Sequence, residues 1–183
     1  MQKILHYSLL LLALTVLFSC EDKAKNPFPE IKNGVHFVAR PDPLPATVTA
    51  ANVNTIPVSL TGAATATASF TTQSLNANEI ERVDAYVSHV RGTTVTPTAA
   101  AAPNGVLLKP VAALNGKDQI PLVEMLSKVG LGASDLRAND RLRVRFVAVM
   151  KDGRTFSATN SGPGITQNPM GTPFTPLLDV LIQ

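Results

Sequence analysis

Proline and glycine recur along nearly the whole chain, and their spacing constrains the fold more than any other feature of the sequence. All 14 prolines and all 11 glycines follow Cys20, and they are spread over the rest of the 183 residues. Both residues favour turns, and the segments between them are short and dominated by Thr, Val and Ala. Short segments separated by turn residues are typical of all-β proteins. The sequence therefore predicts a β-sandwich or a β-barrel.

Alternation of apolar and polar residues marks the individual strands. We expect strands at residues 35–40, 47–50, 56–60, 64–72, 81–91, 106–114, 141–150, 155–158 and 177–182. The clearest is the strand at 141–150, in which every second residue is apolar. The Asp152-Gly153 pair that follows it favours a hairpin with a two-residue type I′ turn. Loops are expected at residues 93–105 and 160–176.

One helix is expected, at residues 121–130. Pro121 suits the first helical position, and Gly130 suits the left-handed conformation that ends many helices. Apolar residues recur between them at helical spacing, at Leu122, Met125, Leu126 and Val129. The predicted β-fold therefore contains one short helix, which we expect to cross from one sheet to the other.

The first 19 residues have the three parts of a bacterial export signal. A positive start at Lys3 precedes an apolar run that ends at Phe18, and the small residue Ser19 comes just before Cys20. A transmembrane anchor is one alternative, but it needs about 20 consecutive apolar residues, and polar residues interrupt the run near His6. An ordinary secreted protein with a spare cysteine is the other alternative.

Cys20 is the only cysteine in the chain. The residues before it resemble the lipobox of bacterial lipoproteins, with Leu17 at the third position before the cysteine. The resemblance implies that the thiol takes a diacylglyceryl group and that cleavage frees an amine for a further acyl chain such as palmitate. We therefore predict lipidation at Cys20, and a membrane as partner through this lipid anchor. With this thiol modified, neither a disulfide nor a Cys-based metal site can form.

These observations divide the chain into three parts. We predict a lipoprotein signal peptide at 1–19, a flexible tether at 20–32 and a single β-sandwich domain at 33–183. The tether is polar, carries prolines and has no apolar periodicity. The net charge of the whole chain is only +3 at pH 7. We therefore expect no nucleic acid partner.

No set of residues has a recognisable catalytic spacing. The histidines after the signal, His36 and His89, each lie on a predicted strand without another metal-ligand type close in sequence. Asp135, Asn139 and Asp140 cluster, but they lack the alternating spacing of a calcium loop. We therefore expect a protein that is not an enzyme and that has no catalytic residues, cofactor or metal.

Four residues are candidate ligand contacts: Tyr86, Arg141, Arg143 and Arg145. The three arginines alternate along one predicted strand, so we expect them to line one of its faces. Such a stripe suits an anion or a glycan, but it is also typical of a solvated strand face that discourages aggregation. Sugar sites usually stack on Trp or Tyr, and the chain has no Trp and two Tyr. This composition gives a strong glycan-binding surface little support, although loop amides and Tyr86 remain available.

Several segments carry a family resemblance. They are residues 81–87, the glycine-rich turn at 130–132, the stretch from Asp140 to Ser157, and the acidic pair Glu21-Asp22 after the cysteine. They resemble small immunoglobulin-like surface lipoproteins of the Bacteroidetes. The resemblance implies an immunoglobulin-like antiparallel β-sandwich, lipid-anchored at the cell outer membrane and exposed on the surface. Proteins of this kind accompany outer-membrane nutrient (polysaccharide) uptake systems, so an importer complex or a glycan is the implied partner.

The sequence thus predicts a lipid-anchored binding or accessory module of the cell envelope without enzymatic activity, which works beside an outer-membrane nutrient or glycan uptake system. The alternative is a structural adhesin or pilus-type subunit that assembles by strand pairing, as the apolar strand at 177–182 suggests. A hydrolase is a third reading, which needs a convergent acid–base pair in a deep pocket.

Overall fold

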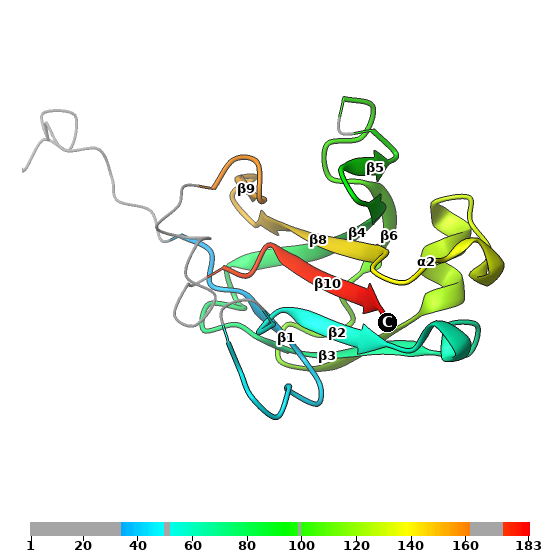
Figure 1. Ribbon diagram of the computed structural model, residues 1–183. Coiled ribbons are helices and arrows are strands. Elements are labelled where there is room, and N and C mark those ends of the chain that lie inside the picture. The colour runs from blue at the N-terminus through cyan, green and yellow to red at the C-terminus, as the bar shows by residue number, and fades with distance from the viewer. Residues whose placement is uncertain (1–33, 50–51, 99, 162–173) are drawn as a thin grey trace, which may run out of the picture. The chain divides into compact units, whose positions relative to one another are not determined.

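The alternating segments form two β-sheets whose apolar faces meet in a common core (Figure 1). The computed structural model describes residues 34–49, 52–98, 100–161 and 174–183. Residues 35–183 form one compact unit. The predicted signal peptide, the predicted tether and Cys20 lie outside the described residues, so those three predictions stay predictions.

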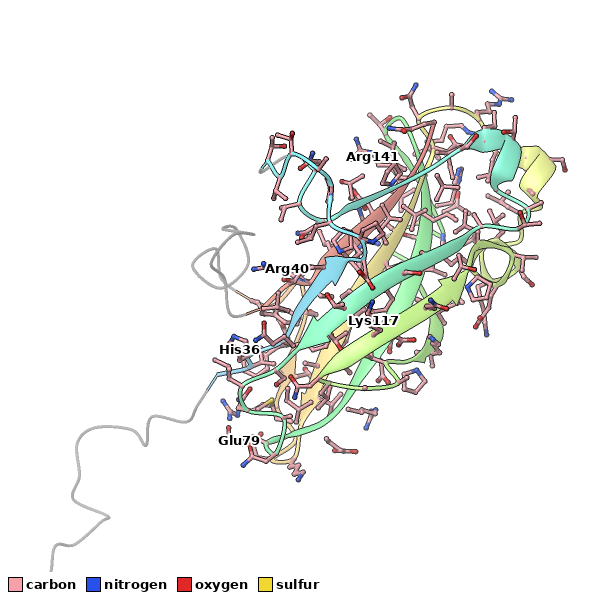
Figure 2. All side chains as sticks on the ribbon, turned by 90° about the horizontal axis from the view of Figure 1, so that it is seen from below. His36, Arg40, Glu79, Lys117 and Arg141 are labelled. Atoms are coloured by element: carbon pink, nitrogen blue, oxygen red, sulfur yellow. The ribbon has the colours of Figure 1, made fainter. Side chains whose placement is uncertain are left out.

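The smaller sheet has three antiparallel strands in the order β1-β3-β7. They are β1 (Val38–Pro41), β3 (Thr67–Gln73) and β7 (Gly116–Pro121). The outer face of this three-stranded sheet is polar (Figure 2). On it, Lys117 Nζ lies 2.8 Å from a carboxylate oxygen of Asp42, in the turn after β1.

The larger sheet has seven strands in the order β2-β10-β8-β4-β5, with β6 also paired to β4 and β9 to β8. They are β2 (Thr55–Val58), β4 (Ile80–Arg91), β5 (Thr94–Thr96), β6 (Val106–Pro110), β8 (Arg141–Met150), β9 (Thr155–Phe156) and β10 (Leu177–Ile182). Neighbouring strands are antiparallel except β2 and β10, which run parallel. The structure confirms the predicted all-β sandwich of immunoglobulin-like type with one short helix.

Two long strands, β4 and β8, form the centre of the seven-stranded sheet. They pair with each other along nearly their whole length. The other edge of β4 is shared end to end by β5 and β6, and the other edge of β8 is shared by β10 and β9. A short strand therefore borders each half of each long strand.

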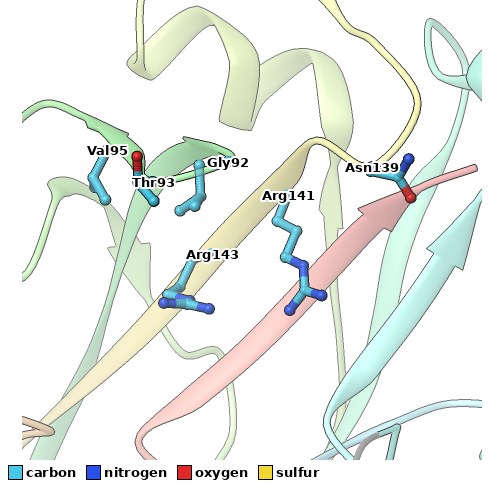
Figure 3. Close-up of a pocket in the computed structure, with 7 residues that line it drawn as sticks. Gly92, Thr93, Val95, Asn139, Arg141 and Arg143 are labelled. Carbon is cyan, nitrogen blue, oxygen red and sulfur yellow. The ribbon is translucent and has the colours of Figure 1, made fainter.

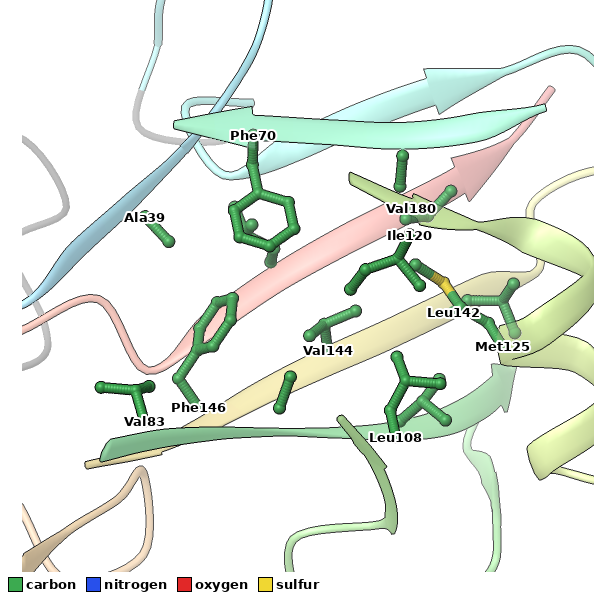
Figure 4. Packing of buried hydrophobic residues seen from close by; sticks show 14 of the residues in the cluster. Ala39, Phe70, Val83, Leu108, Ile120, Met125, Leu142, Val144, Phe146 and Val180 are labelled. Carbon is green, nitrogen blue, oxygen red and sulfur yellow. The ribbon is translucent and has the colours of Figure 1, made fainter. Parts of the chain in front are cut away.

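Three phenylalanines join the two sheets in the middle of the core. Phe146 on β8 meets Phe70 on β3 with ring centroids 5.7 Å apart, and it meets Phe37, just before β1, at 5.4 Å. Figure 4 shows Phe70 and Phe146 pointing toward each other from opposite sheets. All three rings are almost fully buried. Burial of one such ring contributes about 1.5–3 kcal/mol, so this trio is a main link between the sheets.

The inward faces of the long strands follow the predicted alternation. Residues buried on the predicted faces are Val83, Ala85 and Val87 on β4, Leu142, Val144, Phe146, Ala148 and Met150 on β8, and Leu178, Val180 and Ile182 on β10. The prediction that the apolar last strand must be paired or covered is also confirmed. β10 is an inner strand, with β2 on one side and β8 on the other.

The expected helix is present as α2 (Leu122–Lys128). Pro121 is the last residue of β7 and occupies the N-cap position rather than the first helical position. Gly130 has a φ of 73°, as predicted for the residue that ends the helix. Short 3-10 turns lie at Leu60–Gly62 and Ala133–Asp135. None of the helices in the described part of the chain is long and apolar enough to cross a membrane.

Two of the predicted strands are wrong in kind, beyond small shifts at the ends of others. Residues 47–49 do not form a strand, because they follow a proline-rich turn and face solvent. The strand expected at 106–114 ends at Pro110, and a further strand, β7, begins at Gly116. β7 carries mostly polar residues, so apolar alternation did not reveal it.

Two predicted connections are also wrong. The expected loop at 93–105 contains β5, because Gly92 has a φ of 59° and makes a two-residue hairpin with Thr93. The turn at Asp152-Gly153 is not a two-residue turn. Met150 N–H donates to the Arg154 carbonyl (2.8 Å), so three residues form the loop, and Gly153, with a φ of 85°, is its last residue.

Candidate functional site

The three predicted arginines lie on the outer face of β8, as their alternation indicates. Arg145 is paired with Tyr86 of β4 and with Leu177 of β10, and Arg143 is paired with Asp179 of β10. The structure therefore brings all four predicted contact residues onto one face of the seven-stranded sheet. It also adds Asp179, whose role the sequence did not reveal because it lies within an apolar strand.

Asp179 holds two of the three arginines. Its carboxylate accepts hydrogen bonds from Arg143 Nε (2.8 Å) and Arg143 Nη2 (2.9 Å), which is a bidentate pair. Arg141 Nη1 reaches the same carboxylate at a longer distance of 3.3 Å. The hydrogen bonds that Arg143 donates to Asp179 raise the pKa of Arg143. One carboxylate thus faces two guanidinium groups, and it is engaged mainly by Arg143.

Arg145 lies in a different environment. Its Nη1 donates a hydrogen bond to Ser88 Oγ at 2.6 Å. Burial lowers the pKa of Arg145, and the charge of Arg143 acts in the same direction. No ion pair joins Arg145 to a carboxylate within the described ranges. Arg145 therefore packs on the outer face of the seven-stranded sheet and holds the hydroxyl group of Ser88 in place.

A pocket of about 450 Å³ opens beside Arg141 and Arg143 (Figure 3). Its lining residues are Val90, Gly92, Thr93, Val95, Asn139, Arg141 and Arg143. Two predicted contacts, Arg141 and Arg143, therefore line it, whereas Tyr86 and Arg145 do not. The sequence did not indicate a pocket here, because it predicts a loop at residues 93–105, where the β4–β5 hairpin forms one wall of the pocket.

Two turns with positive φ angles border the pocket. Gly92 begins the hairpin between β4 and β5, which brings Thr93 and Val95 to one side. Asn139 has a φ of 72°, which asparagine tolerates better than most residues, and its N–H donates to the Ile182 carbonyl at 2.8 Å. This bond ties the start of β8 to the end of β10. Backbone turns therefore position the rim of the pocket.

A second polar cluster lies at the same end of the sheet, centred on the buried Asp140. Arg91 donates to both carboxylate oxygens of Asp140, at 2.9 and 2.6 Å. The N–H of Arg137 donates to the same carboxylate at 2.9 Å. His89 Nε2 lies 3.1 Å from Asp140 Oδ2, but it is not aligned as a hydrogen bond. The sequence assigned Asn139-Asp140 to a turn and gave no sign that β4 would bring His89 and Arg91 to it.

The electrostatics of this cluster keep the Asp140 carboxylate charged at neutral pH. The Arg91 guanidinium holds the pKa of Asp140 well below its usual range. The N–H of Arg137 acts in the same direction and burial opposes both. Asp140 also holds the chain by its backbone, since its carbonyl accepts a hydrogen bond from the N–H of Ile182 at 2.9 Å. The cluster therefore ties β4, β8 and β10 together.

Another buried carboxylate, Asp118, explains why the polar segment β7 belongs to the sandwich. Lys109 Nζ lies 2.7 Å from Asp118 Oδ1. The N–H groups of Ala112 and Gln119 donate to the same carboxylate at 3.0 and 2.7 Å. Burial alone would raise the pKa of Asp118, but these partners outweigh it and lower the pKa. The side chain thus connects the segment after β6 to β7.

The predicted histidines have structural partners. His36 Nδ1 accepts a hydrogen bond from the N–H of Leu75 at 3.1 Å, and the His36 N–H donates to Asn76 Oδ1 at 3.0 Å. His36 thus holds the turn that follows β3. Within the described ranges, no three His, Cys, Asp or Glu residues come close enough to hold a metal ion.

Comparison with known proteins adds no assignment. The sequence matches no model of a known protein family, and no curated protein matches it. The chemistry of the pocket therefore rests on its own residues. It offers two positive charges, a hydroxyl, an amide and apolar valine surface, which are groups that bind a ligand.

Proposed function

We propose that the protein is a lipid-anchored, non-enzymatic binding or accessory module of the cell envelope, which works beside an outer-membrane nutrient or glycan uptake system. One observation carries the binding part of this proposal. The four residues predicted as ligand contacts lie on the outer face of the seven-stranded sheet. Two of them, Arg141 and Arg143, line a pocket of about 450 Å³. Pockets of about 300–1,000 Å³ are typical for small ligands.

The arginines at this pocket are suited to binding because they are held in place. The bidentate pair between Arg143 and Asp179 fixes one guanidinium before any ligand arrives. A hydrolase would need a base and an acid or nucleophile directed at one point. The pocket lining offers arginine, threonine and asparagine but no carboxylate or histidine. These side chains favour recognition over general acid–base chemistry.

The anchor part of the proposal rests on the sequence around Cys20. The apolar run before this cysteine and the polar segment after it are typical of a lipoprotein precursor. Two or more acyl chains hold a protein on a membrane, whereas one chain binds only marginally. A module with this anchor works where solutes and importers meet, which fits a role in uptake.

No observation favours the alternative of a strand-pairing subunit. β10, the strand that suggested it, already has a partner along both edges. One edge strand of the larger sheet, β2, carries Pro57, which has no N–H to offer to an incoming strand. Strand addition would therefore need another edge.

Purification of the tagged full chain from detergent-solubilised envelopes tests the module. We expect an outer-membrane importer to co-purify with the wild-type protein. The matched control is Cys20→Ser, which keeps the sandwich domain and removes the lipid site. Recovery of the chain as a self-assembled polymer, or as a single protein without an importer, would contradict the proposal.

The anchor has a separate test. With labelled palmitate, the wild-type chain should acquire label and migrate at the size of the cleaved protein. Cys20→Ser should acquire no label and keep its signal peptide, because the cleavage that follows lipidation requires the modified cysteine. Normal maturation of this variant would show that Cys20 is not the anchor.

A further inference from the structure

We infer that the pocket at Arg141 and Arg143 binds a small ligand that presents one anionic oxygen group, a carboxylate or a sulfur oxyanion, on an apolar body. This inference rests on the proposed function of the protein as a binding module, and it names the chemical class that the module takes. Arg141 is the contact for the anion, and Asp179 competes with the ligand for the same arginine.

The charge balance around the pocket calls for one negative charge. Arg141 and Arg143 supply two positive charges, and Asp179 supplies one negative charge. The lining itself contains no acidic side chain. Arg145 lies on the same face but does not line the pocket. Among the residues at the pocket, one positive charge thus remains without a counterpart, and a ligand with a single negative charge restores the balance there.

Arg141 is the guanidinium that can meet this charge. Asp179 is already engaged by two short hydrogen bonds from Arg143, and its contact with Arg141 is the longest of the three, at 3.3 Å. The Arg141 side chain is also the more exposed, at 46% against 27% for Arg143. A ligand oxyanion can therefore replace the weak Asp179 contact of Arg141 without disturbing the bidentate pair.

The rest of the pocket suits an apolar body rather than a second charge. Val90 and Val95 are cross-strand neighbours on β4 and β5 and form an apolar part of the lining. Thr93 and Asn139 can contribute one or two neutral hydrogen bonds. Burial of the valine surface by the ligand adds a hydrophobic contribution to the electrostatic one.

Matched aromatic probes test the class of ligand. Benzoate, benzenesulfonate and benzamide share an apolar ring, and only the first two carry a charge. Each is titrated at pH 7 and low salt into the ¹⁵N-labelled full chain in detergent micelles, and amide shifts of Gly92, Thr93 and Val95 report binding at the pocket. We expect at least one of the anions to bind about tenfold more tightly than benzamide. The stronger of the two identifies the oxyanion.

Three variants test the residues. Arg141→Gln should weaken anion binding about tenfold and leave benzamide binding unchanged. Asp179→Asn removes the competing charge but keeps an oxygen that can accept a hydrogen bond from Arg143. It should therefore tighten anion binding severalfold, a gain that a damaged fold cannot produce. Arg154→Gln is the matched control, since Arg154 pairs with Asp152 in the β8–β9 hairpin and does not line the pocket. It should leave both affinities unchanged.

The inference fails if benzamide binds as tightly as both anions, if none of the probes shifts the pocket amides, or if Asp179→Asn weakens anion binding. These outcomes concern the purified protein alone. If an importer co-purifies but the protein binds no anion, the inference about the pocket is wrong and the proposed envelope module is retained. If the protein binds the anion but no importer co-purifies, the proposed uptake role is wrong and the inference about the pocket is retained.

Discussion

At the scale of single residues, the most consequential side chain is Asp140. It is almost completely buried, and its partners come from β4 and from the turn that precedes β8. A buried charge is tolerated only when it is paired, and Asp140 is paired with Arg91, whose side chain is 38% exposed, and with the N–H of Arg137.

We predict that Asp140→Asn lowers the free energy of unfolding by about 2 kcal/mol at neutral pH, because it removes the charge that accepts hydrogen bonds from Arg91 and from the N–H of Arg137. Arg91 depresses the pKa of Asp140 in the folded state, so the stabilisation is full above the unfolded carboxyl pKa of about 4 and is lost as the pH falls below it. Urea unfolding of both proteins at pH 7 and pH 3 measures this. The difference between them should shrink at pH 3.

The control for this prediction is Glu81→Gln, an exposed carboxylate that pairs with Arg82 on the surface. Its effect should stay within about 0.5 kcal/mol at both pH values. A difference between wild type and Asp140→Asn that is equally large at pH 3 would show that the carboxylate acts by its shape rather than by its charge.

Residue-scale predictions from the sequence were accurate where alternation decides the outcome. The three arginines were placed on one face because side chains alternate along any strand. Asp179 and Asp140 could not be assigned, because their partners are brought to them by β8 and β4. A hydrogen-bond partner distant in the chain has no local signature, so the pocket was also beyond sequence analysis.

At the scale of elements, the fold depends on close approaches between neighbouring strands. Gly105 precedes β6 and has a φ of 99°. A β-carbon at this position would lie 2.4 Å from the carbonyl oxygen of Val87 on β4. The glycine thus lets the loop return to the edge of β4 just where β6 begins.

We predict that Gly105→Ala destabilises the protein by about 2–4 kcal/mol, because it adds backbone strain to a clash with a strand. Gly130→Ala is the matched control. Gly130 also has a positive φ, of 73°, but a β-carbon there meets nothing within 4 Å. It should cost about 1–2 kcal/mol. Thermal unfolding compares the two, and equal losses would contradict the proposed clash.

Element-scale predictions succeeded for the long strands and the helix, and failed for the short polar elements. β4, β8 and α2 each bury a regular apolar set, and such a set is visible in the sequence. β7 has a single buried apolar residue, Ile120, and turns the buried side chain of Asp118 toward Lys109 instead. A strand that is stabilised by a salt bridge has no apolar alternation to detect.

At the scale of the whole molecule, the order of strands in the larger sheet was beyond prediction. Alternation tells which face of a strand is buried, but it does not tell which strand lies beside it. The parallel pairing of β2 with β10 joins Ile56 to Val180, across most of the domain. The all-β class was predictable because it follows from local patterns, whereas the sheet order follows from long-range packing.

We predict that deletion of residues 177–183 abolishes folding. β10 contributes three buried residues, and its loss would expose the inner edges of both β2 and β8. Far-ultraviolet circular dichroism and size-exclusion chromatography of the deleted chain measure this. A folded, soluble monomer from a wild-type protein that polymerises would instead support the strand-pairing subunit.

The central place of β10 has a consequence for the time at which the protein can fold. The larger sheet closes only when residues 177–182 have entered between β2 and β8, and the ribosome makes these residues after every other strand of the described sandwich. Until then the core is incomplete, and non-local pairing of this kind is slow to form. The sandwich therefore cannot complete its larger sheet while residues 177–182 are still inside the ribosome, and its folding ends after their synthesis.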